Sequence, residues 1–215
     1  LAIALSLSVC AAAAVLFAQA TPGRASGLRL YVLDGGVLES DPARYQLAPA
    51  DVGITQLSIA AYLIVHPQGV LLWETGAVTD GEWTPGAMPV VHRLTLDDKE
   101  ERRVTIAKTL RAQLASAGVA PGDVTHLALS HAHWDHSANA NAFASATWLV
   151  RPEEREAMWS ATPGVTRRAT YAALRDSRTT LLRLDEHDVF GDGTVVVKRA
   201  AGHTVGHQVL FVKLP

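Results

Sequence analysis

Residues 131–136 of this chain read His-Ala-His-Trp-Asp-His, which places three imidazoles and a carboxylate within six residues. An apolar run, residues 124–130, precedes them and is expected to be a strand. Side chains two residues apart point the same way in extended backbone, so His131 and His133 can bind one cation. The chain then turns and can present Asp135 and His136 to a second cation. Neutral imidazoles with a carboxylate suit zinc, and less often iron or manganese, and an open position on such a metal generates hydroxide near neutral pH.

A second histidine cluster lies further along the chain. Residues 202–207 read Gly-His-Thr-Val-Gly-His, so this segment can supply a missing ligand. A histidine-rich segment can also be a solvated turn or a single structural metal site. The second cluster favours a metal centre that performs chemistry.

These residues give the chain a family resemblance. The HxHxDH signature of the metallo-β-lactamase superfamily is matched at every fixed position by residues 131–136. Three further segments occur in the family's order: 72–76, 188–193 and 202–207. Within the superfamily the chain is most similar to the N-acyl-homoserine lactonase group, on residues 30–36, 135–141 and 188–193. The resemblance covers nearly all of the chain from about Leu28 to Pro215.

The resemblance implies an α/β (α+β) fold, the αββα sandwich, in which two mixed sheets pack face to face, helices lie outside and the metals sit at one edge. It implies that His131, His133 and His203 bind metal 1 and that Asp135 and His136 bind metal 2, with two zinc ions in the full-length protein. The family's bridging aspartate and last histidine come later than residues 202–207. Both are therefore expected beyond Pro215, and the domain 28–215 is expected to be incomplete at its C-terminus.

Other polar residues have less specific settings. Asp192 is an alternative bridging ligand, but its Gly-Asp-Gly context predicts a turn residue. Glu74 stands where most members of the family have an aspartate that holds the metal-binding loops by hydrogen bonds. His207 is expected to support the site through a hydrogen bond or to pack at a strand end. Four histidines lack a close second histidine and are not predicted to be ligands; His66, next to Pro67, is expected to be exposed, and the others are His92, His126 and His187.

Apolar and aromatic residues are compatible with more than one role. Four tryptophans fit either a core or the wall of a substrate pocket: Trp73, Trp83, Trp134 and Trp148. Residues 39–52 and 78–89 are expected to be surface loops, where substrate choice is usually set.

The hydrophobic pattern predicts alternating strands and helices. A first strand, 28–33, is expected to end at the turn signal Asp34-Gly35-Gly36, and 58–66 and 70–73 are expected to form a hairpin. Ile106, Leu110 and Leu114 recur at helical spacing, which predicts a helix of about three turns that Asp97 or Asp98 caps and Gly118 ends. The strand 124–130 then delivers His131 at its carboxyl end, where open α/β sheets bind ligands. Later strands are predicted at 147–150, 180–184, 194–199 and 208–213, and helices at 138–143 and 152–160.

The first 20 residues carry no charge, are rich in Ala, Leu and Val, and end in Ala-Gln-Ala. This pattern predicts a signal peptide cleaved near Ala20, a linker at 21–27 and export to the periplasm or the medium. Its basic region and initiator Met are missing, so the sequence is expected to begin inside the leader. An uncleaved leader is the alternative, because about 20 apolar residues can span a bilayer and would hold the protein in a membrane. A lipoprotein is not favoured, because apolar residues continue after Cys10.

Composition limits the partners. The chain has 19 basic and 21 acidic residues, and no charged stripe predicts a nucleic-acid surface. The single cysteine, Cys10, lies in the leader, so the mature protein would have neither a disulfide nor a thiolate ligand. A partner or substrate is therefore expected to be recognised locally, and the resemblance implies a small-molecule substrate, a lactone or a similar cyclic ester or amide.

Metal-assisted hydrolysis is the chemistry that the resemblance implies: hydroxide attacks a carbonyl that one metal polarises while the other steadies the leaving group. Asp135 would act as the catalytic residue that orients the water or carries its proton to the leaving group. Ser130 lacks the context of a nucleophile elbow, so a structural role is assigned to it.

Three functions are compatible with these residues. The subgroup segments favour an exported lactonase acting on acyl-homoserine lactones or similar esters. Another hydrolase of the superfamily, including a β-lactamase, is the second, and export argues against a glyoxalase-type thioesterase or an RNA-processing enzyme. A metal-binding protein without catalysis, or a redox relative that uses iron, is the third, because fold alone does not choose among chemistries.

Overall fold

The strands form two sheets, one of eight strands and one of three, within residues 27–85, 90–160 and 164–214, the part of the chain that the computed structural model describes. The predicted leader, residues 1–20, and almost all of the predicted linker lie outside these residues. Within the same ranges, no helix combines the length and the apolar character that crossing a membrane requires.

The large sheet is mixed, with the order β4-β5-β1-β2-β3-β6-β7-β8. The strands from β4 to β3 pair antiparallel, whereas β3, β6, β7 and β8 pair parallel. Parallel neighbours place their carboxyl ends at one edge of the sheet. The bounds are β1 Arg29–Glu39, β2 Gln56–His66, β3 Gly69–Trp73, β4 Val90–Thr95, β5 Glu101–Ile106, β6 His126–Ala128, β7 Thr147–Val150 and β8 Thr179–Leu181.

The small sheet packs on one face of the large sheet. Its strands pair antiparallel in the order β11-β10-β9, with bounds β9 Glu186–Asp188, β10 Val195–Arg199 and β11 Gln208–Val212. Val195 and Val197 of β10 share a buried cluster with Ile64, Leu71 and Leu149 of the large sheet. This alternation of inward-facing residues builds an apolar layer between the two sheets.

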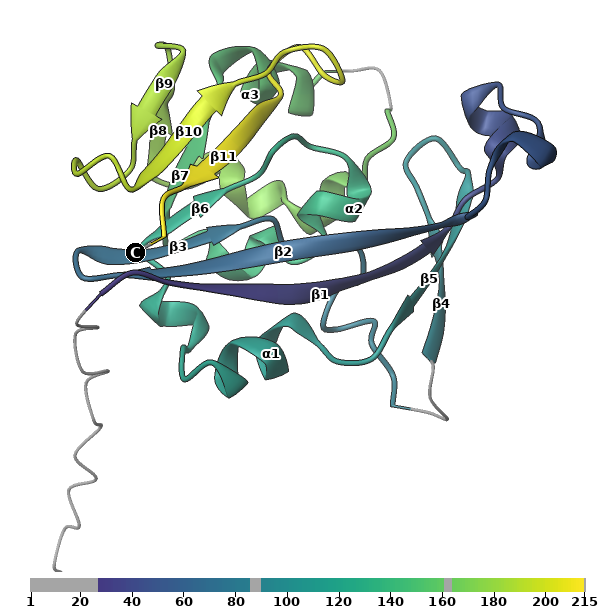
Figure 1. The fold of residues 1–215 in the computed structure, drawn as a ribbon, viewed down its shortest axis with the longest axis horizontal. Helices are drawn as coiled ribbons and strands as arrows, with labels where there is room; N and C mark the ends of the chain where they lie inside the picture. Colours follow the sequence, from purple (N-terminus) through teal and green to yellow (C-terminus); the bar gives the residue numbers. More distant parts are fainter. Residues whose placement is uncertain (1–26, 86–89, 161–163, 215) are drawn as a thin grey trace, which may run out of the picture.

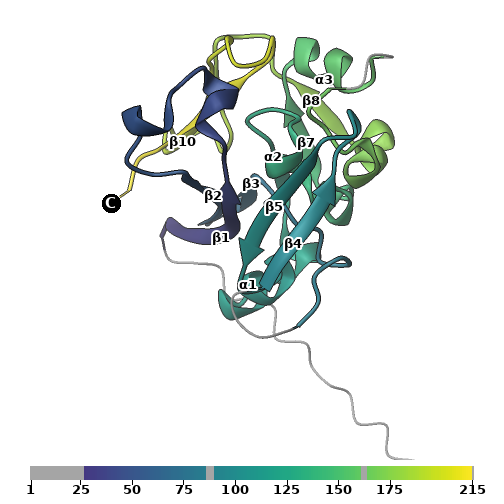
Figure 2. The same ribbon diagram turned by 90° about the vertical axis from the view of Figure 1, so that its right-hand side faces the viewer.

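Helices cover the other face of the large sheet (Figures 1 and 2). Leu114 and Met158, from α1 (Leu110–Ser116) and α3 (Pro152–Met158), pack with Leu63, Leu127 and Trp148 of the sheet. The short helix α2 spans Trp134–Ser137, and the 3-10 helices are η1 Pro42–Tyr45, η2 Pro49–Asp51, η3 Pro121–Asp123, η4 Ala140–Phe143, η5 Arg168–Thr170 and η6 Ala172–Asp176. The predicted fold class, two packed sheets with helices outside, is confirmed.

The expected turn at Gly35-Gly36 is wrong, because β1 continues through both glycines to Glu39. The pairing with β2 shifts between Asp34 and Gly36, which is a β-bulge. Gly36 has φ +117°, and a Cβ there would lie 2.5 Å from Cγ1 of Val104. The glycines therefore allow a bulge and a close approach of β5.

The expected start of the helix after residue 97 is also wrong. Residues 96–100 form the turn between β4 and β5, and Ile106 belongs to β5. The helix α1 begins at Leu110, where the Thr109 side chain accepts a hydrogen bond from the N–H of Ala112, and Gly118 follows its end with φ +75°. Spacings of four residues fit both the period of a helix and the alternation of a strand, so Ile106 satisfied either pattern.

Most other predicted elements are found with small shifts at their ends. The hairpin of β2 and β3 is confirmed, and 147–150 is a strand with the predicted bounds. The helix predicted at 138–143 is the 3-10 helix η4, and α2 forms inside the histidine motif itself. The strands β4, β5 and β9 were not predicted.

Candidate metal centre

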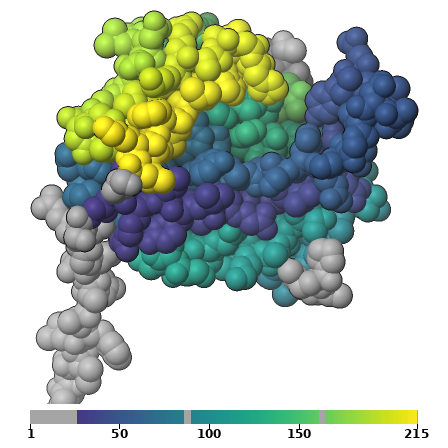
Figure 3. Space-filling view, viewed as in Figure 1, coloured from purple at the N-terminus to yellow at the C-terminus, as the bar shows by residue number. Residues whose placement is uncertain are grey.

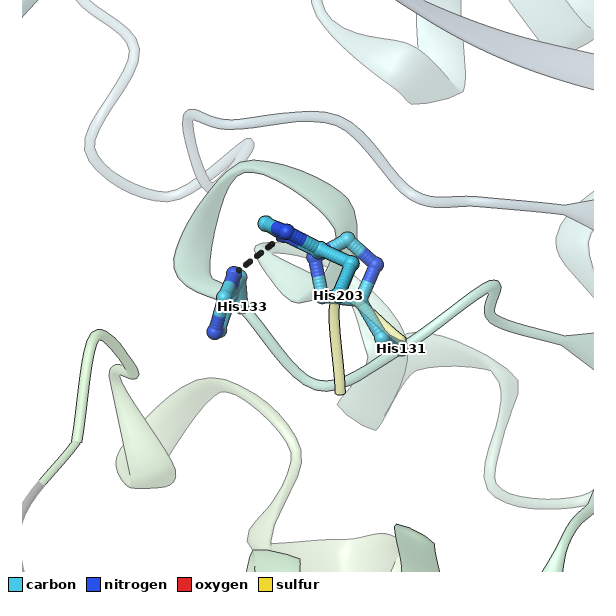
Figure 4. Close-up of side chains that lie close together, drawn as sticks. All are labelled: His131, His133 and His203. Carbon is cyan, nitrogen blue, oxygen red and sulfur yellow. Dashed lines mark hydrogen bonds between the residues drawn. The ribbon is translucent and has the colours of Figure 1, made fainter. Parts of the chain in front are cut away.

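The loop after β6 carries His131 and His133 at the carboxyl end of the parallel strands, and the loop before β11 carries His203. Figure 4 shows the three imidazoles converging from these two segments. One ligand atom from each lies within 4.8 Å of the others. Nδ1 of His133 is 3.1 Å from Nε2 of His203. The structure thus brings together the three residues that the sequence predicts for metal 1.

His131 has the most enclosed imidazole of the three, with 3 % of the residue exposed. Its Nδ1 lies 2.8 Å from Oγ of Ser130, whereas its Nε2 is buried without a hydrogen-bond partner among the described residues. Such an orphaned nitrogen is costly unless something binds it. A cation at Nε2 would satisfy it, so the residues present fit a metal ion.

His131 and His133 are held in the neutral form that binds metals. Burial and the charges of neighbouring imidazoles lower the pKa of His131 far below its usual range. Burial, with the neighbouring His203, lowers the pKa of His133 to about 4 against an opposing effect of Asp135. A cation therefore displaces no proton from either residue near neutral pH.

Asp135 and His136, the residues predicted for metal 2, lie beside the triad. Oδ2 of Asp135 is 3.4 Å from Nε2 of His136, and the rings of His136 and His131 are 4.2 Å apart. Burial lowers the pKa of His136, but the carboxylates of Glu74 and Asp135 outweigh this effect and raise it to about 10. Burial raises the pKa of Asp135, and the hydrogen bond and charge of His136 reverse the shift and lower it. The two side chains form a charged pair.

Glu74 connects the end of β3 to the histidine loop. It is 3 % exposed and has φ +67°, a left-handed conformation that is uncommon for a residue with a Cβ. Oε1 accepts a hydrogen bond of 2.8 Å from the N–H of Ser130. Oε2 lies 3.1 Å from Nδ1 of His136, at ion-pair distance but outside good hydrogen-bond geometry. Thr75 adds a hydrogen bond of 2.8 Å from its N–H to the carbonyl of His136.

The remaining histidines lie in other settings. The expectation that His66 is exposed is wrong: it is 7 % exposed, stacks on Phe190 at 4.3 Å and lies 2.9 Å from Oδ2 of Asp192. Asp192 occupies the β9–β10 turn and also accepts hydrogen bonds from Thr194. The ring of His207 lies 5.2 Å from that of His131, and its Nδ1 is buried without a partner in the described part of the chain.

Three of the four tryptophans considered above lie in the core. Trp73, Trp134 and Trp148 are each at most 5 % exposed, and Trp83 packs against the cluster that holds Trp134. The loop that joins β1 and β2 projects from the right-hand end of these strands in Figure 1, and its residues Tyr45, Leu47 and Ile54 are exposed. Figure 3 shows the face hollowed between this loop and the yellow segment that leads to the C-terminus.

Sequence reasoning missed Glu154, a buried carboxylate in the first turn of α3. A glutamate at that position favours the helix N-terminus whether or not it is solvated. The local sequence therefore holds no signal of its burial beside the histidine loops.

Comparisons with known proteins agree with this geometry. The family model described as the metallo-beta-lactamase superfamily matches residues 54–215. The N-acyl homoserine lactonase AttM of Rhizobium radiobacter is 30 % identical over 199 residues, which cover 87 % of this chain and 72 % of that protein.

Solved structures share the fold. The structure of a mutant of AiiA from B. thuringiensis, with N-decanoyl-L-homoserine bound at its active site, has a TM-score of 0.67 and 21 % identity over 86 % of this chain and 70 % of that one. The structure of AidC, described as a dizinc quorum-quenching lactonase, has a TM-score of 0.56 and 17 % identity over 86 % of this chain and 67 % of that one.

Proposed function

Because the chain belongs to the metallo-β-lactamase superfamily and is a lactonase-like metallo-hydrolase of that family, we propose that it is a zinc enzyme that opens N-acyl-homoserine lactones or closely related cyclic esters. The observation that carries the proposal is the convergence of His131, His133 and His203, with ligand atoms within 4.8 Å of one another. The names of the curated relatives support the substrate class.

His131, His133 and His203 would hold one zinc ion, and Asp135 with His136 would contribute to the second. Zinc bound there would supply a Lewis acid that polarises the lactone carbonyl and activates water. The unpartnered Nε2 of His131 and the neutral state of His131 and His133 support this assignment. A soft thiolate ligand is not needed, since imidazole and carboxylate suit zinc by themselves.

The protein's own side chains would orient the reaction. Ser130 holds Nδ1 of His131, which leaves Nε2 available to bind a metal ion. Glu74 holds the backbone of Ser130 and lies against His136. The carboxylate of Asp135 would accept the proton of the attacking water and pass it to the ring oxygen as the C–O bond of the lactone breaks. Water thus adds to the carbonyl carbon, and the products are a hydroxyl group and a carboxylic acid.

A pH-stat measurement tests the proposal, because ring opening releases an acid. The zinc-loaded full-length protein would be titrated with acyl-homoserine lactones, γ-butyrolactone, a penicillin and a cephalosporin. We expect lactone turnover to exceed β-lactam turnover at least about tenfold, a barrier difference of about 1.4 kcal/mol. Asp135→Asn should slow turnover while some metal stays bound. Turnover of β-lactams alone would refute the substrate, and turnover of neither class would favour a metal-binding protein without catalysis.

Export is part of the proposal. The uncharged, Ala-rich composition of residues 1–20 supports it. N-terminal sequencing of protein recovered from the periplasm or medium should begin near Thr21. Recovery of the uncleaved chain in the membrane fraction would instead indicate an anchored protein.

A further inference from the structure

Glu154 lies between the two loops that carry the histidine triad. It belongs to the first turn of α3 and is 4 % exposed, although it is a charged residue. Buried carboxylates are costly unless hydrogen bonds satisfy them. The partners of this carboxylate therefore explain why it is there.

All of its partners come from the two histidine loops. Oε1 accepts a hydrogen bond of 2.9 Å from the N–H of Ala132, the residue between His131 and His133. Oε2 accepts hydrogen bonds of 2.6 Å from Oγ1 of Thr204 and 3.1 Å from the N–H of Gly206. The three partners are donors, which matches a carboxylate that only accepts.

Gly206 gives independent evidence that this contact is close. A Cβ built on Gly206 would lie 2.5 Å from Cβ of Glu154 and also inside contact distance of its backbone nitrogen. Backbone of α3 cannot move away as a flexible side chain could. The loop of His203 therefore reaches α3 only because residue 206 has no side chain.

From these contacts we propose that Glu154 is a positioning residue for the metal centre. Its two carboxylate oxygens hold the two loops at the separation that lets His203 meet His131 and His133, and Gly206 permits the approach. Outer hydrogen bonds of this kind orient metal ligands and commonly change metal affinity about 10- to 100-fold when they are removed. The inference rests on the proposed function, since it concerns the metal that this function requires.

Zinc affinity measured by competition with a chromophoric chelator tests the inference. Glu154→Gln keeps the shape of the side chain but turns an NH2 group toward at least one of the three donors. We therefore expect zinc to bind at the metal 1 site about tenfold or more weakly. Thr204→Val removes one hydrogen bond and should cause a smaller loss. Gly206→Ala should weaken binding with Glu154 intact.

Two control variants separate positioning from general stability. Glu156→Gln makes the same charge change on an exposed residue of α3, and Ile64→Val deletes one buried methyl group in β2. Both should bind zinc as the unchanged protein does, although Ile64→Val lowers the Tm of the metal-free protein. A loss of affinity in Ile64→Val that tracked its Tm would mean that Glu154 acts only through stability, and would overturn the proposal.

The double variant Glu154→Gln/Gly206→Ala completes the test. Because both changes break the same contact, its loss of affinity should be smaller than the product of the two single losses. Full zinc affinity in Glu154→Gln, or independent losses in the double variant, would overturn the proposal. These measurements need no substrate: a protein that binds zinc tightly but opens no lactone would refute the proposed function and leave this inference standing.

Discussion

Nδ1 of His133 lies 3.1 Å from Nε2 of His203, although 70 residues separate them in the sequence. The contact joins the loop after β6 to the loop before β11, so the metal centre exists only where the parallel strands and the small sheet meet. Each side contributes ligands that the other lacks.

Metal content is the first prediction. We expect about two zinc ions per chain in the full-length protein and the loss of one of them in His131→Ala/His133→Ala, because a three-ligand site tolerates the loss of imidazoles poorly. Elemental analysis after gel filtration measures it. His126→Ala, outside the triad, serves as the control, and full metal content in the double variant would refute the ligand assignment.

The second prediction concerns stability and pH in the metal-free protein. The folded pKa of His133 is about 4 and its unfolded value about 6.5, so only the unfolded chain takes up this proton in between, and stability falls as the pH drops from 6.5 to 4. The folded pKa of His136 is about 10, so its contribution to the stability of the folded protein is complete below pH 6.5 and is lost as the pH rises to 10. The free energy of unfolding, measured with urea at each pH, should depend less on pH between 4 and 6.5 in His133→Gln. In His136→Gln it should depend less on pH between 6.5 and 10. Unchanged slopes would contradict both assignments.

The third prediction concerns Glu74. Burial opposes protonation of His136, and Glu74 is the leading charge that favours it, so Glu74→Gln should lower the pKa of His136 by about 1–3 units. NMR titration of the metal-free protein reads this directly, with His126 as an internal reference. A pKa that stays near 10 would show that Asp135 alone sustains it.

The fourth prediction concerns His66, which lies outside the metal centre. Its ring stacks on Phe190, and the Asp192 side chain that it meets is 37 % exposed, so stacking should matter more than charge. We expect His66→Ala to lower the free energy of unfolding by about 2 kcal/mol and His66→Phe by less. Zinc affinity should not change in either variant. Equal losses in the two variants would show that the contact with Asp192 dominates.

The sequence predicts the convergence of His131, His133 and His203 because short motifs place ligands through local backbone geometry and the family resemblance supplies the pairing of distant segments. Strand 147–150 and the β2–β3 hairpin were predictable for the same reason, since period and turn residues are local signals.

What could not be predicted depends on contacts between distant segments. Glu154 looks like an ordinary residue of a helix start until two loops close over it. The neighbour Pro67 marks a turn at His66, but burial comes from Phe190 and from Asp192, 126 residues later. The sequence Gly35-Gly36 is compatible with a turn or a bulge. The bulge forms because Val104 of β5 packs closely against Gly36.

The 70-residue separation of His133 and His203 gives a bound cation the topological role that a disulfide has elsewhere. Cross-linking a loop of that length in the unfolded chain would remove conformational entropy worth about 4 kcal/mol. Thiols cannot supply this link here, because the chain's single cysteine is Cys10. The ion would therefore act as a reversible staple between the sheets, and metal starvation would loosen the architecture as well as stop the chemistry.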